Sequence, residues 1–598
     1  MTVLFSLRNF WYIKIFESVI RELSARGHAV RLVADERGPV EVEEEGEGAD
    51  PWEAAAARLS AECAGVSFRY FERDEIGSWT AFSAQTRIAG DYLRFLDSAY
   101  DGAPMLKARA GERAPEFVRG LGRVWPFNGA PGRQLLRRAF TMAEQAAPDP
   151  PEVTALLDEE RPDVVLVSPL VSLGSPQFDI LRVARHRGCR TALAVGSWDH
   201  LSSKALIRDV PDLVLVWNDT QRDEAVRFHH VPEARVAVTG AQCFDQWFGR
   251  APALDARAFK SRVGLPVDRP YVLWVCSALF DGSPNEARFV REWVRAVQAH
   301  PVLREYGILI RPHPKRLHEW ADVRVDDLEG VAFWPRDAAA PFDEGTKADY
   351  FDSMAHAAAV AGLNTSALIE AGIAGRPVHT VLLPAFRDNQ EGTLHFRYLL
   401  QVGGGLLTAA TALDEHVAQL ASSVTDPGAA EARTARFLEA FVRPRGLDVP
   451  AAPRFVAAVE ALAAAPAPAA QRPGVADRAL RAILAPIARR TRGTESVERR
   501  RRFEIKRQQR AEEVHRREDD KRRRLEAEED ARRIRLARER ADDEARKAAR
   551  VAERAGRLAE KERQKAAAIS RKARAKFVSR MRARVARLLG RGRSEEHT

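Results

Sequence analysis

Short apolar runs alternate with helical segments along the first part of the chain. The run "MTVLFSL" is followed by the helical pattern "YIKIFESVIRELSARGH", in which Gly27 is a helix stop, and then by the run "AVRLVAD". The same rhythm returns at "PDVVLVSPL", "RTALAVGSW", "PDLVLVWN" and "ARVAVTG". Alternation of this kind predicts a parallel sheet covered by helices.

After residues 252–268 the rhythm starts again. Its apolar runs are "YVLWVCS", "YGILIRPHP", "VAFWPRD", "AAVAGLN", "RPVHTVLL" and "GGGLLTA". We therefore predict an α/β fold with two Rossmann-like domains that face a cleft, one over residues 1–250 and one over residues 267–464. Within the first domain, residues 51–150 are expected to form an irregular, mostly helical insertion.

The C-terminal part has a different composition. Residues 465–496 are predicted to be a linker and a short helix, and residues 497–589 a long charged helix. The formal charge of the whole chain is +10. The segment 497–589 alone carries +16, from 34 Lys and Arg against 18 Asp and Glu, so the rest of the chain carries −6. The last residues, 593–598, resemble a translated sequencing adapter, so they are expected to be an artefact.

Composition narrows the expected surroundings of the protein. A chain of 598 residues is too long for one core, and its 45% of hydrophobic residues suffices for several. The four cysteines are scattered without a metal-ligand spacing, which is typical of a cytosolic protein. The N-terminus has no secretory leader, and no window reaches the roughly 20 apolar residues of a membrane span. We expect a cytoplasmic protein.

One polar turn stands out in the second domain. In "GLNTSALIEAGIAGRP" an apolar strand runs into Asn364, Thr365 and Ser366, and a helix carrying Glu370 follows. Unpaired N–H groups at such a helix start suit a diphosphate, and Glu370 suits two sugar hydroxyls. Alternatively, Asn364 caps an ordinary helix and Glu370 is a solvated surface residue.

Further polar residues follow other predicted strands. "RPHPK" places Arg311, His313 and Lys315 after one strand, where they suit the charge of a diphosphate leaving group. Ser277, at the end of "YVLWVCS", is a further candidate ligand. The loop "FRDNQEG" contains Asp388, Asn389 and Gln390. These residues either bind ligand or belong to a plain solvent-exposed connection.

The first domain offers candidates for acid–base chemistry. Asp199 and His200, in "GSWDHLSSK", are each a candidate general base for an acceptor hydroxyl, or else a helix cap and a packed ring. The loop "SLRNFWY" lacks glycines, so its Asn9 and aromatic residues are expected to shape an acceptor pocket. With no Asp-x-Asp and no His or Cys cluster, we expect neither a metal site nor a tightly bound cofactor.

These motifs resemble the donor-binding element of GT-B glycosyltransferases. The polar turn, Glu370, Gly375 and Pro377 are similar in spacing to that element in the lipid II N-acetylglucosaminyltransferase and in the UDP-N-acetylglucosamine 2-epimerases. The resemblance implies that the turn binds diphosphate, that Glu370 holds the ribose, and that residues 388–390 contact the sugar. "RPHP" is also similar to an element of CDP-glycerol glycerophosphotransferases, although the Ser-Asp-x-Ser-Ser signature of that family is absent.

The resemblance implies a glycosyltransferase of surface-polysaccharide or glycolipid synthesis. Its donor would be a nucleotide-diphosphate sugar of the UDP or CDP type, and its acceptor a saccharide or a lipid-linked saccharide. The alternatives are a sugar-nucleotide 2-epimerase, a CDP-glycerol-type transferase, and a non-catalytic scaffold with a helical interaction tail.

The end of the long helix suggests a further partner. Phe577, Met581, Val585 and Leu588 lie about one turn apart on a basic background. Such a helix suits an anionic membrane surface, on the inner face of the cell membrane. Nucleic acid is disfavoured because the tail has few aromatic residues and the rest of the chain is acidic. A solvated spacer, or oligomerisation through a coiled coil, remains an alternative.

Overall fold

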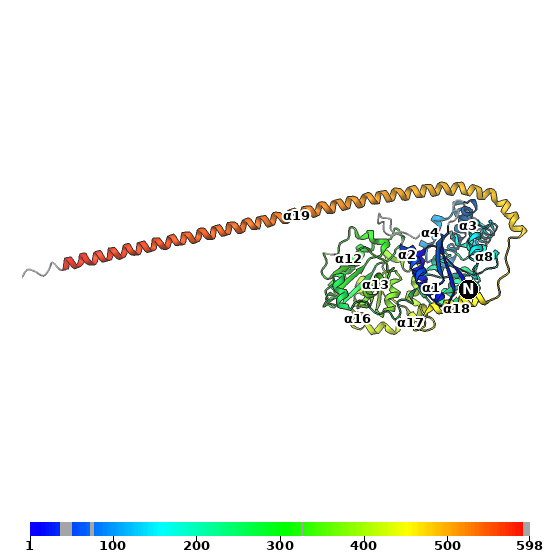
Figure 1. The fold of residues 1–598 in the computed structure, drawn as a ribbon, viewed down its shortest axis with the longest axis horizontal. Helices are drawn as coiled ribbons and strands as arrows, with labels where there is room; N and C mark the ends of the chain where they lie inside the picture. The colour runs from blue at the N-terminus through cyan, green and yellow to red at the C-terminus, as the bar shows by residue number, and fades with distance from the viewer. Residues whose placement is uncertain (36–50, 72–76, 326, 590–598) are drawn as a thin grey trace, which may run out of the picture. The chain divides into compact units, whose positions relative to one another are not determined.

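The computed structural model describes residues 1–35, 51–71, 77–325 and 327–589. Residues 593–598, which were expected to be an adapter-derived artefact, lie outside the described residues. The chain divides into two compact units, Met1–Ser496 and Val497–Thr598. Within the first unit two α/β domains carry one parallel sheet each, and a long C-terminal helix follows, so the predicted fold class is confirmed (Figure 1).

The first domain is built on a seven-stranded parallel sheet. Its strand order is β3-β2-β1-β4-β5-β6-β7. The strands are β1 (Thr2–Leu7), β2 (Ala29–Ala34), β3 (Val66–Tyr70), β4 (Val164–Ser168), β5 (Arg190–Ala194), β6 (Leu213–Val216) and β7 (Val236–Val238). All five residues of β4 are buried, as a strand with helices on both faces requires. The order reverses between β1 and β4, which is the doubly wound arrangement.

Helices cover both faces of this sheet. Successive residues of β1 point to opposite faces of the sheet. Phe5 packs with α1 in the core on one face, and Leu4 packs with α8 in the core on the other. The helices of this domain are α1 (Ile13–Ala25), α2 (Pro51–Glu62), α7 (Pro151–Glu160), α8 (Gln177–His186), α9 (His200–Ser203) and α10 (Asp219–His229).

The segment expected to be a helical insertion differs from that expectation at its start. There α2 and β3 extend the β-α-β pattern, because β3 pairs in parallel with β2 at the sheet edge. The helical part is made of α3 (Ser78–Arg94), α4 (Pro104–Arg113), α5 (Glu116–Leu121) and α6 (Ala130–Gln145). Buried Arg87 of α3 pairs with Glu144 of α6 at 2.6 Å and joins the helical part to the rest of the domain through Asp179 of α8, at 2.7 Å.

The second domain has a six-stranded parallel sheet of the same winding. Its order is β10-β9-β8-β11-β12-β13, with the reversal between β8 and β11. The strands are β8 (Tyr271–Val275), β9 (Gly307–Arg311), β10 (Val331–Phe333), β11 (Ala359–Gly362), β12 (Val378–Val381) and β13 (Thr408–Ala410). The helices are α11 (Ala256–Val263), α12 (Glu286–Ala299), α13 (Glu344–Ala355), α14 (Ala367–Ile373), α15 (Phe396–Gln401), α16 (Leu413–Thr425) and α17 (Glu431–Phe441).

One helix that follows the second domain packs on the first. Helix α18 (Ala451–Ala464) buries Phe455 and Val456 in the core that contains α1. Residues up to 464 were predicted to belong to the second domain, but this helix crosses back. The two domains also touch through their helices, because Glu17 of α1 pairs with Lys347 of α13 at 3.1 Å.

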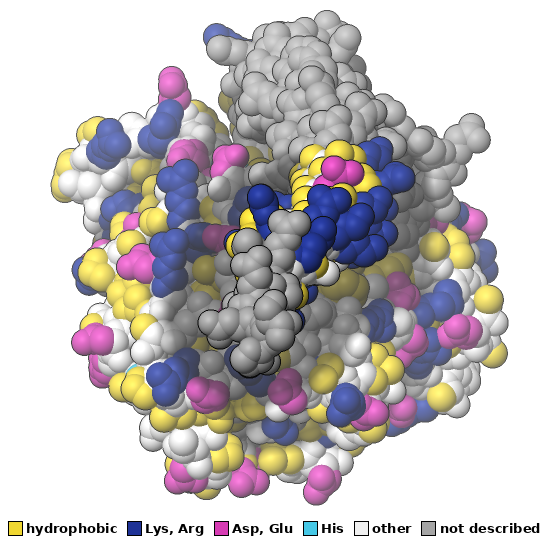
Figure 2. Space-filling model, turned by 90° about the vertical axis from the view of Figure 1, so that its left-hand side faces the viewer, with side chains coloured by type: hydrophobic (Ala, Val, Ile, Leu, Met, Phe, Trp, Pro, Cys, Tyr) yellow, Lys and Arg dark blue, Asp and Glu magenta, His cyan; other side chains and the backbone are white. Residues whose placement is uncertain are grey.

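The long helix α19 (Val475–Leu589) begins before the predicted linker ends and continues into the second compact unit. Over residues 545–587 every side chain is exposed. Figure 2 shows Lys and Arg side chains gathered along the described end of this helix. In the part of the chain that the structure describes, no helix combines the length and the apolar character that crossing a bilayer requires.

Candidate functional site

Three predicted segments meet at the carboxyl edge of the second sheet. Strand β8 lies between β9 and β11, and all three are parallel. The segment after β9, which carries His313, and the turn that starts at Asn364 after β11 therefore flank Ser277, which follows β8. The backbone N–H of Asn364 donates to Ser277 Oγ at 3.0 Å. This is the point where the strand order reverses, at which doubly wound sheets form a crevice.

The turn itself is firmly attached on one side. The Asn364 side chain donates to the main-chain oxygen of Asn389, so it does not cap α14. Thr365 is half-buried and Ser366 is exposed, which leaves their side chains at the surface of the turn. Gly362 stands immediately before, and a Cβ there would lie 2.7 Å from Val275 O, so the close approach of β8 and β11 requires glycine.

Glu370 of α14 belongs to a buried polar network. Tyr350 of α13 donates its hydroxyl hydrogen to the Glu370 carboxylate. Burial raises the pKa of Glu370, an effect that the Tyr350 hydroxyl and the charge of Lys14 oppose. Arg311 lies over the Tyr350 ring, 4.8 Å from its centroid, and pairs with Asp349 at 3.2 Å. Glu370 is therefore an oriented acceptor rather than a solvated surface residue.

A pocket of about 380 Å³ opens beside Arg311. Its wall includes the ring of Trp334, whose Nε1 donates to Asp349 at 2.9 Å. Arg262 lies 5.8 Å from the Trp334 ring centroid, and Arg336 also lines the pocket. An aromatic wall with several guanidinium groups suits a flat, anionic ligand. The sequence analysis missed this pocket, although "VAFWPRD" was predicted to contain a strand end.

His313 is neutral and has a defined tautomer. Burial, followed by the charges of Lys315 and Lys14, lowers the pKa of His313 to about 4. Its Nδ1 accepts the backbone N–H of Lys315 at 3.2 Å, so the ring proton is assigned to Nε2. A neutral imidazole of this kind donates a hydrogen bond from Nε2. The Lys315 side chain is exposed.

The first domain supplies a cation that the sequence analysis missed. Lys14, at the start of α1, has its Nζ 3.8 Å from the Trp11 ring centroid. Its charge lowers the pKa of both Glu370 and His313, which belong to the second domain. The first strand-to-helix loop, predicted to shape an acceptor pocket, thus brings positive charge to the donor side. Phe10 of the same loop is buried against Phe68 and Tyr70.

The two predicted bases lie in another buried cluster. The Asp199 carboxylate accepts from Ser197 Oγ at 2.6 Å and lies 3.0 Å from Lys204 Nζ. Burial alone would raise the pKa of Asp199, but Lys204 and neighbouring imidazoles hold it well below its usual range. Burial lowers the pKa of His200 to about 4. Asp199 is thus a persistent anion and a weak base, whereas His200 is neutral.

A residue of the second domain joins this cluster. His395 packs edge-on against Trp198, with 4.8 Å between ring centroids, and its Nδ1 has no hydrogen-bond partner. Burial lowers the pKa of His395 to about 4, an effect that Asp199 opposes. Nothing in the sequence placed His395 beside Asp199, because the two residues are in different domains.

The loop predicted to contact the sugar is held by its own side chains. Asn389 accepts from the Phe280 N–H at 2.7 Å and donates to Ser283 Oγ at 2.8 Å. Gln390 is fully buried and donates to the main-chain oxygens of Leu363 and Val381, at 3.2 and 3.1 Å. Both side chains face the protein, whereas Asp388 is exposed. Asn389 and Gln390 therefore fix the loop beside the turn.

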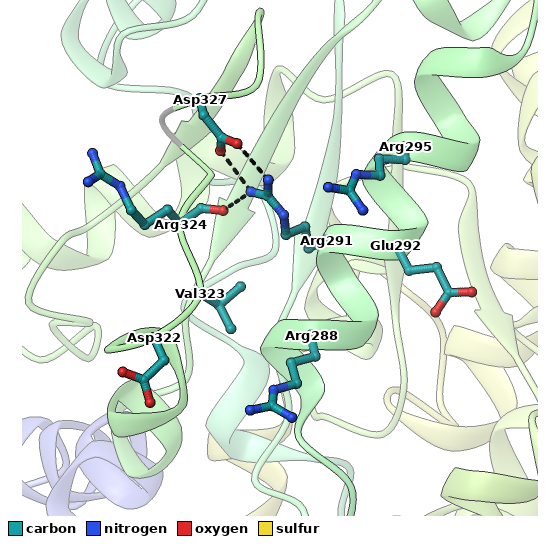
Figure 3. Close-up of a pocket in the computed structure, with 8 residues that line it drawn as sticks. All are labelled: Arg288, Arg291, Glu292, Arg295, Asp322, Val323, Arg324 and Asp327. Carbon is teal, nitrogen blue, oxygen red and sulfur yellow. Dashed lines mark hydrogen bonds and ion pairs between the residues drawn. The ribbon is translucent and has the colours of Figure 1, made fainter.

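A larger pocket, of about 690 Å³, contains none of the predicted residues. Figure 3 shows Arg291 of α12 forked onto Asp327, with Arg288 and Arg295 along the same helix. The fork is made by hydrogen bonds of 2.7 and 2.5 Å. Asp327 is exposed and Arg291 is half-buried, so water screens the pair and it contributes little to stability. Among the described residues, no group of three or more His, Cys, Asp or Glu side chains is arranged to hold a metal ion.

Comparisons with known proteins reveal structural likeness at low identity. No known protein family and no curated protein matches the sequence. Among solved structures, the chain is similar to the UDP-GlcNAc 2-epimerase from Methanocaldococcus jannaschii, at 12% identity, 77% of this chain, 100% of that one and a TM-score of 0.44. It is similar to the UDP-GlcNAc 2-epimerase from Neisseria meningitidis, bound to UDP-GlcNAc, at 11% identity over 77% of this chain and 100% of that one, with a TM-score of 0.40. It is also similar to CalG4, the calicheamicin glycosyltransferase, at 14% identity over 78% of this chain and 99% of that one, with a TM-score of 0.40. The function of this chain is therefore argued from its own residues.

Proposed function

We propose that the protein is a glycosyltransferase that uses a nucleotide-diphosphate sugar in the synthesis of a surface polysaccharide or glycolipid. One observation carries the proposal: the turn at residues 364–366, His313 and Glu370 gather at the strand-order reversal of the second sheet, and Lys14 reaches them from the first domain. A diphosphate needs cations and N–H donors, and a nucleoside needs an oriented carboxylate and an aromatic wall.

In the proposed arrangement the donor lies on the second domain. Glu370, oriented by Tyr350, accepts hydrogen bonds from the ribose hydroxyls, and Trp334 forms a wall for the base. The diphosphate lies between the 364–366 turn and Lys14. Of the three predicted loop residues Asp388 is the exposed one, and we place it beside the sugar. The donor is of the UDP or CDP type, and the acceptor is a saccharide or a lipid-linked saccharide.

In the proposed reaction the acceptor hydroxyl oxygen attacks the anomeric carbon, and the bond from that carbon to the diphosphate oxygen breaks. The acceptor proton passes to a base on the first domain. We assign this role to His200, because its Nδ1 lacks a partner and the negative charge of Asp199 beside it stabilises the imidazolium that forms when the ring takes the proton. Negative charge grows on the departing diphosphate, where Lys14 and the Nε2–H of His313 stabilise it.

Glu370→Ala tests the donor site. Calorimetry of the full chain with UDP, CDP and their sugar conjugates should show one preferred nucleotide, and the variant should bind it at least about tenfold more weakly. Glu292→Ala, the same change at an exposed position of α12, should bind as the unchanged protein does. Unchanged affinity in Glu370→Ala would remove the donor-site assignment, and binding of no nucleotide would indicate a scaffold.

The same donors also separate transfer from epimerisation. A transferase requires an acceptor and releases the nucleoside diphosphate in proportion to product. A 2-epimerase converts the UDP-sugar alone and returns it intact. Incubation with each UDP-sugar in the absence of acceptor, followed by separation of the sugar epimers, should therefore give no new epimer. A new epimer would replace the transferase proposal by the epimerase.

A further inference from the structure

The described end of α19 changes its charge pattern part-way. Between residues 546 and 562 acidic and basic side chains are mixed. From Arg563 to Leu589 there are ten Lys and Arg residues and no Asp or Glu. At 1.5 Å per residue, this basic segment is about 40 Å long. A uniformly cationic rod of this length needs an anionic partner to lower its self-repulsion.

The last four turns also carry an exposed apolar stripe. Phe577, Met581 and Val585 follow one another at intervals of four residues, with exposed fractions of 66%, 49% and 47%. Val578 extends the stripe on one side. At 100° per residue the stripe spans about 100° of the helix circumference. Arg582 and Arg584 flank the stripe on its two sides, and Lys576, Arg580 and Arg587 lie on the side of the helix away from it, so the segment is amphipathic.

We propose that residues 563–589 dock on the surface of an anionic lipid bilayer, with the helix axis in the plane of the interface. The stripe then enters the boundary between head groups and acyl chains, while the flanking Lys and Arg side chains meet anionic head groups. The long stems of these cations allow both contacts at once. This inference concerns the tail alone; only its consequence, that the enzyme works beside lipid-linked acceptors, rests on the proposed function.

Two other occupants fit the segment less well. Nucleic acid would neutralise the cations but would leave the apolar stripe in water, and Phe577 is the one aromatic residue of the segment available for stacking on bases. A second copy of the helix would cover the stripe but would bring ten like charges beside ten more. A bilayer with anionic lipid satisfies both the stripe and the charges.

The test is co-sedimentation of the full chain with lipid vesicles. Vesicles of phosphatidylcholine with about one-third phosphatidylglycerol should bind the protein, and binding should weaken as salt rises. Vesicles of phosphatidylcholine alone should bind it at least about tenfold less, since each cation near an anionic surface adds to the affinity. Equal binding to both vesicles, or binding to neither, would overturn the proposal.

Paired substitutions locate the contact. The double variant Phe577→Gln, Met581→Gln should lose at least about tenfold in partitioning, whereas Val551→Gln, Leu558→Gln, in the mixed-charge part of the same helix, should change it less than about twofold. Glutamine keeps helix propensity, and circular dichroism checks helicity. Equal loss of partitioning in both double variants would overturn the assignment. Vesicle binding that a short RNA or DNA duplex abolishes by competition would overturn it as well. So would sedimentation showing that Phe577→Gln, Met581→Gln converts a dimer to a monomer. Nucleotide calorimetry on the same variants should be unchanged, so failure here differs from failure of the donor site.

Discussion

At the scale of single residues, the sequence located strand ends better than it located side-chain directions. Ser277, His313 and Asn364 follow apolar runs, so their shared edge of the sheet was predictable from parallel pairing. Gln390 follows an apolar run too, but its amide faces three buried partners. Polar character alone does not distinguish a side chain that binds ligand from one that satisfies buried main-chain oxygens.

Lys14 shows the opposite case, a charged residue whose importance comes from the other domain. In the sequence it is one polar position in an amphipathic helix. The structure brings it near Glu370 and His313, whose pKa values its charge lowers. The packing of two separately predicted domains produces this contact, and local sequence patterns carry no information about it.

We predict that Lys14→Met weakens nucleoside-diphosphate binding by about tenfold, or about 1.4 kcal/mol, while nucleoside binding is unchanged. The substitution keeps an unbranched side chain beside Trp11, whose ring the Lys14 Nζ contacts, and removes the charge. Calorimetry with a nucleoside, its monophosphate and its diphosphate measures the difference. Lys107→Met, at an exposed position of α4, is the matched control. An equal loss for all three ligands would mean that Lys14 acts on the fold and not on the phosphates.

At the scale of elements, the apolar runs that have helices on both faces were the most predictable. The run "VVLVS" is continuous and forms the fully buried β4. In the edge strand β3, "VSFRY", Val66 is the only buried residue, and this segment was assigned to a helical insertion. Residues 451–464, which form helix α18, were assigned to the second domain. The docking of this helix on the first domain was not predicted, because the apolar face of an Ala-rich helix does not identify the core it packs on.

The start of α12 contains a titratable contact that supports the site. Buried Glu286 accepts from the Ser277 N–H at 2.8 Å and from Trp274 Nε1 at 3.3 Å. Burial raises the pKa of Glu286 from 4.5 to about 8. The carboxyl is therefore mostly protonated at pH 7, and it fixes the residue that bonds to the Asn364 turn.

The sign of the resulting pH dependence follows from linkage. Between pH 4.5 and about 8 the folded state holds a proton at Glu286 that the unfolded state has released, so stability falls as the pH rises and levels above about 8. Glu286→Gln imitates the protonated acid and should remove this part of the decline. Urea unfolding at about pH 5.5 and pH 8.5 measures it, as the difference between variant and unchanged protein. Parallel declines in both proteins would show that Glu286 ionises normally.

At the scale of the first compact unit, two connections hold the two domains together. Helix α18 carries the chain back from the second domain to the core around α1. The pair of Glu17 and Lys347 joins α1 to α13, the helices that present Lys14 and Tyr350 to the site. A movement that separates α1 from α13 would therefore break this ion pair.

Two single substitutions of this ion pair separate its role in stability from its role in restraining opening. Glu17→Ala leaves Lys347, which is 3% exposed, with Glu344 as its remaining acidic partner, so we expect a loss of about 2–4 kcal/mol in unfolding free energy. Lys347→Met leaves Glu17 paired with Arg21 and Arg58, so the loss should be about 1 kcal/mol. Denaturant unfolding measures both, and a double-mutant cycle isolates the coupling. If the pair also restrains opening, Lys347→Met should raise the association rate of the preferred nucleotide even though it lowers stability. A stability loss without any change in that rate would show that the pair only holds the domains together.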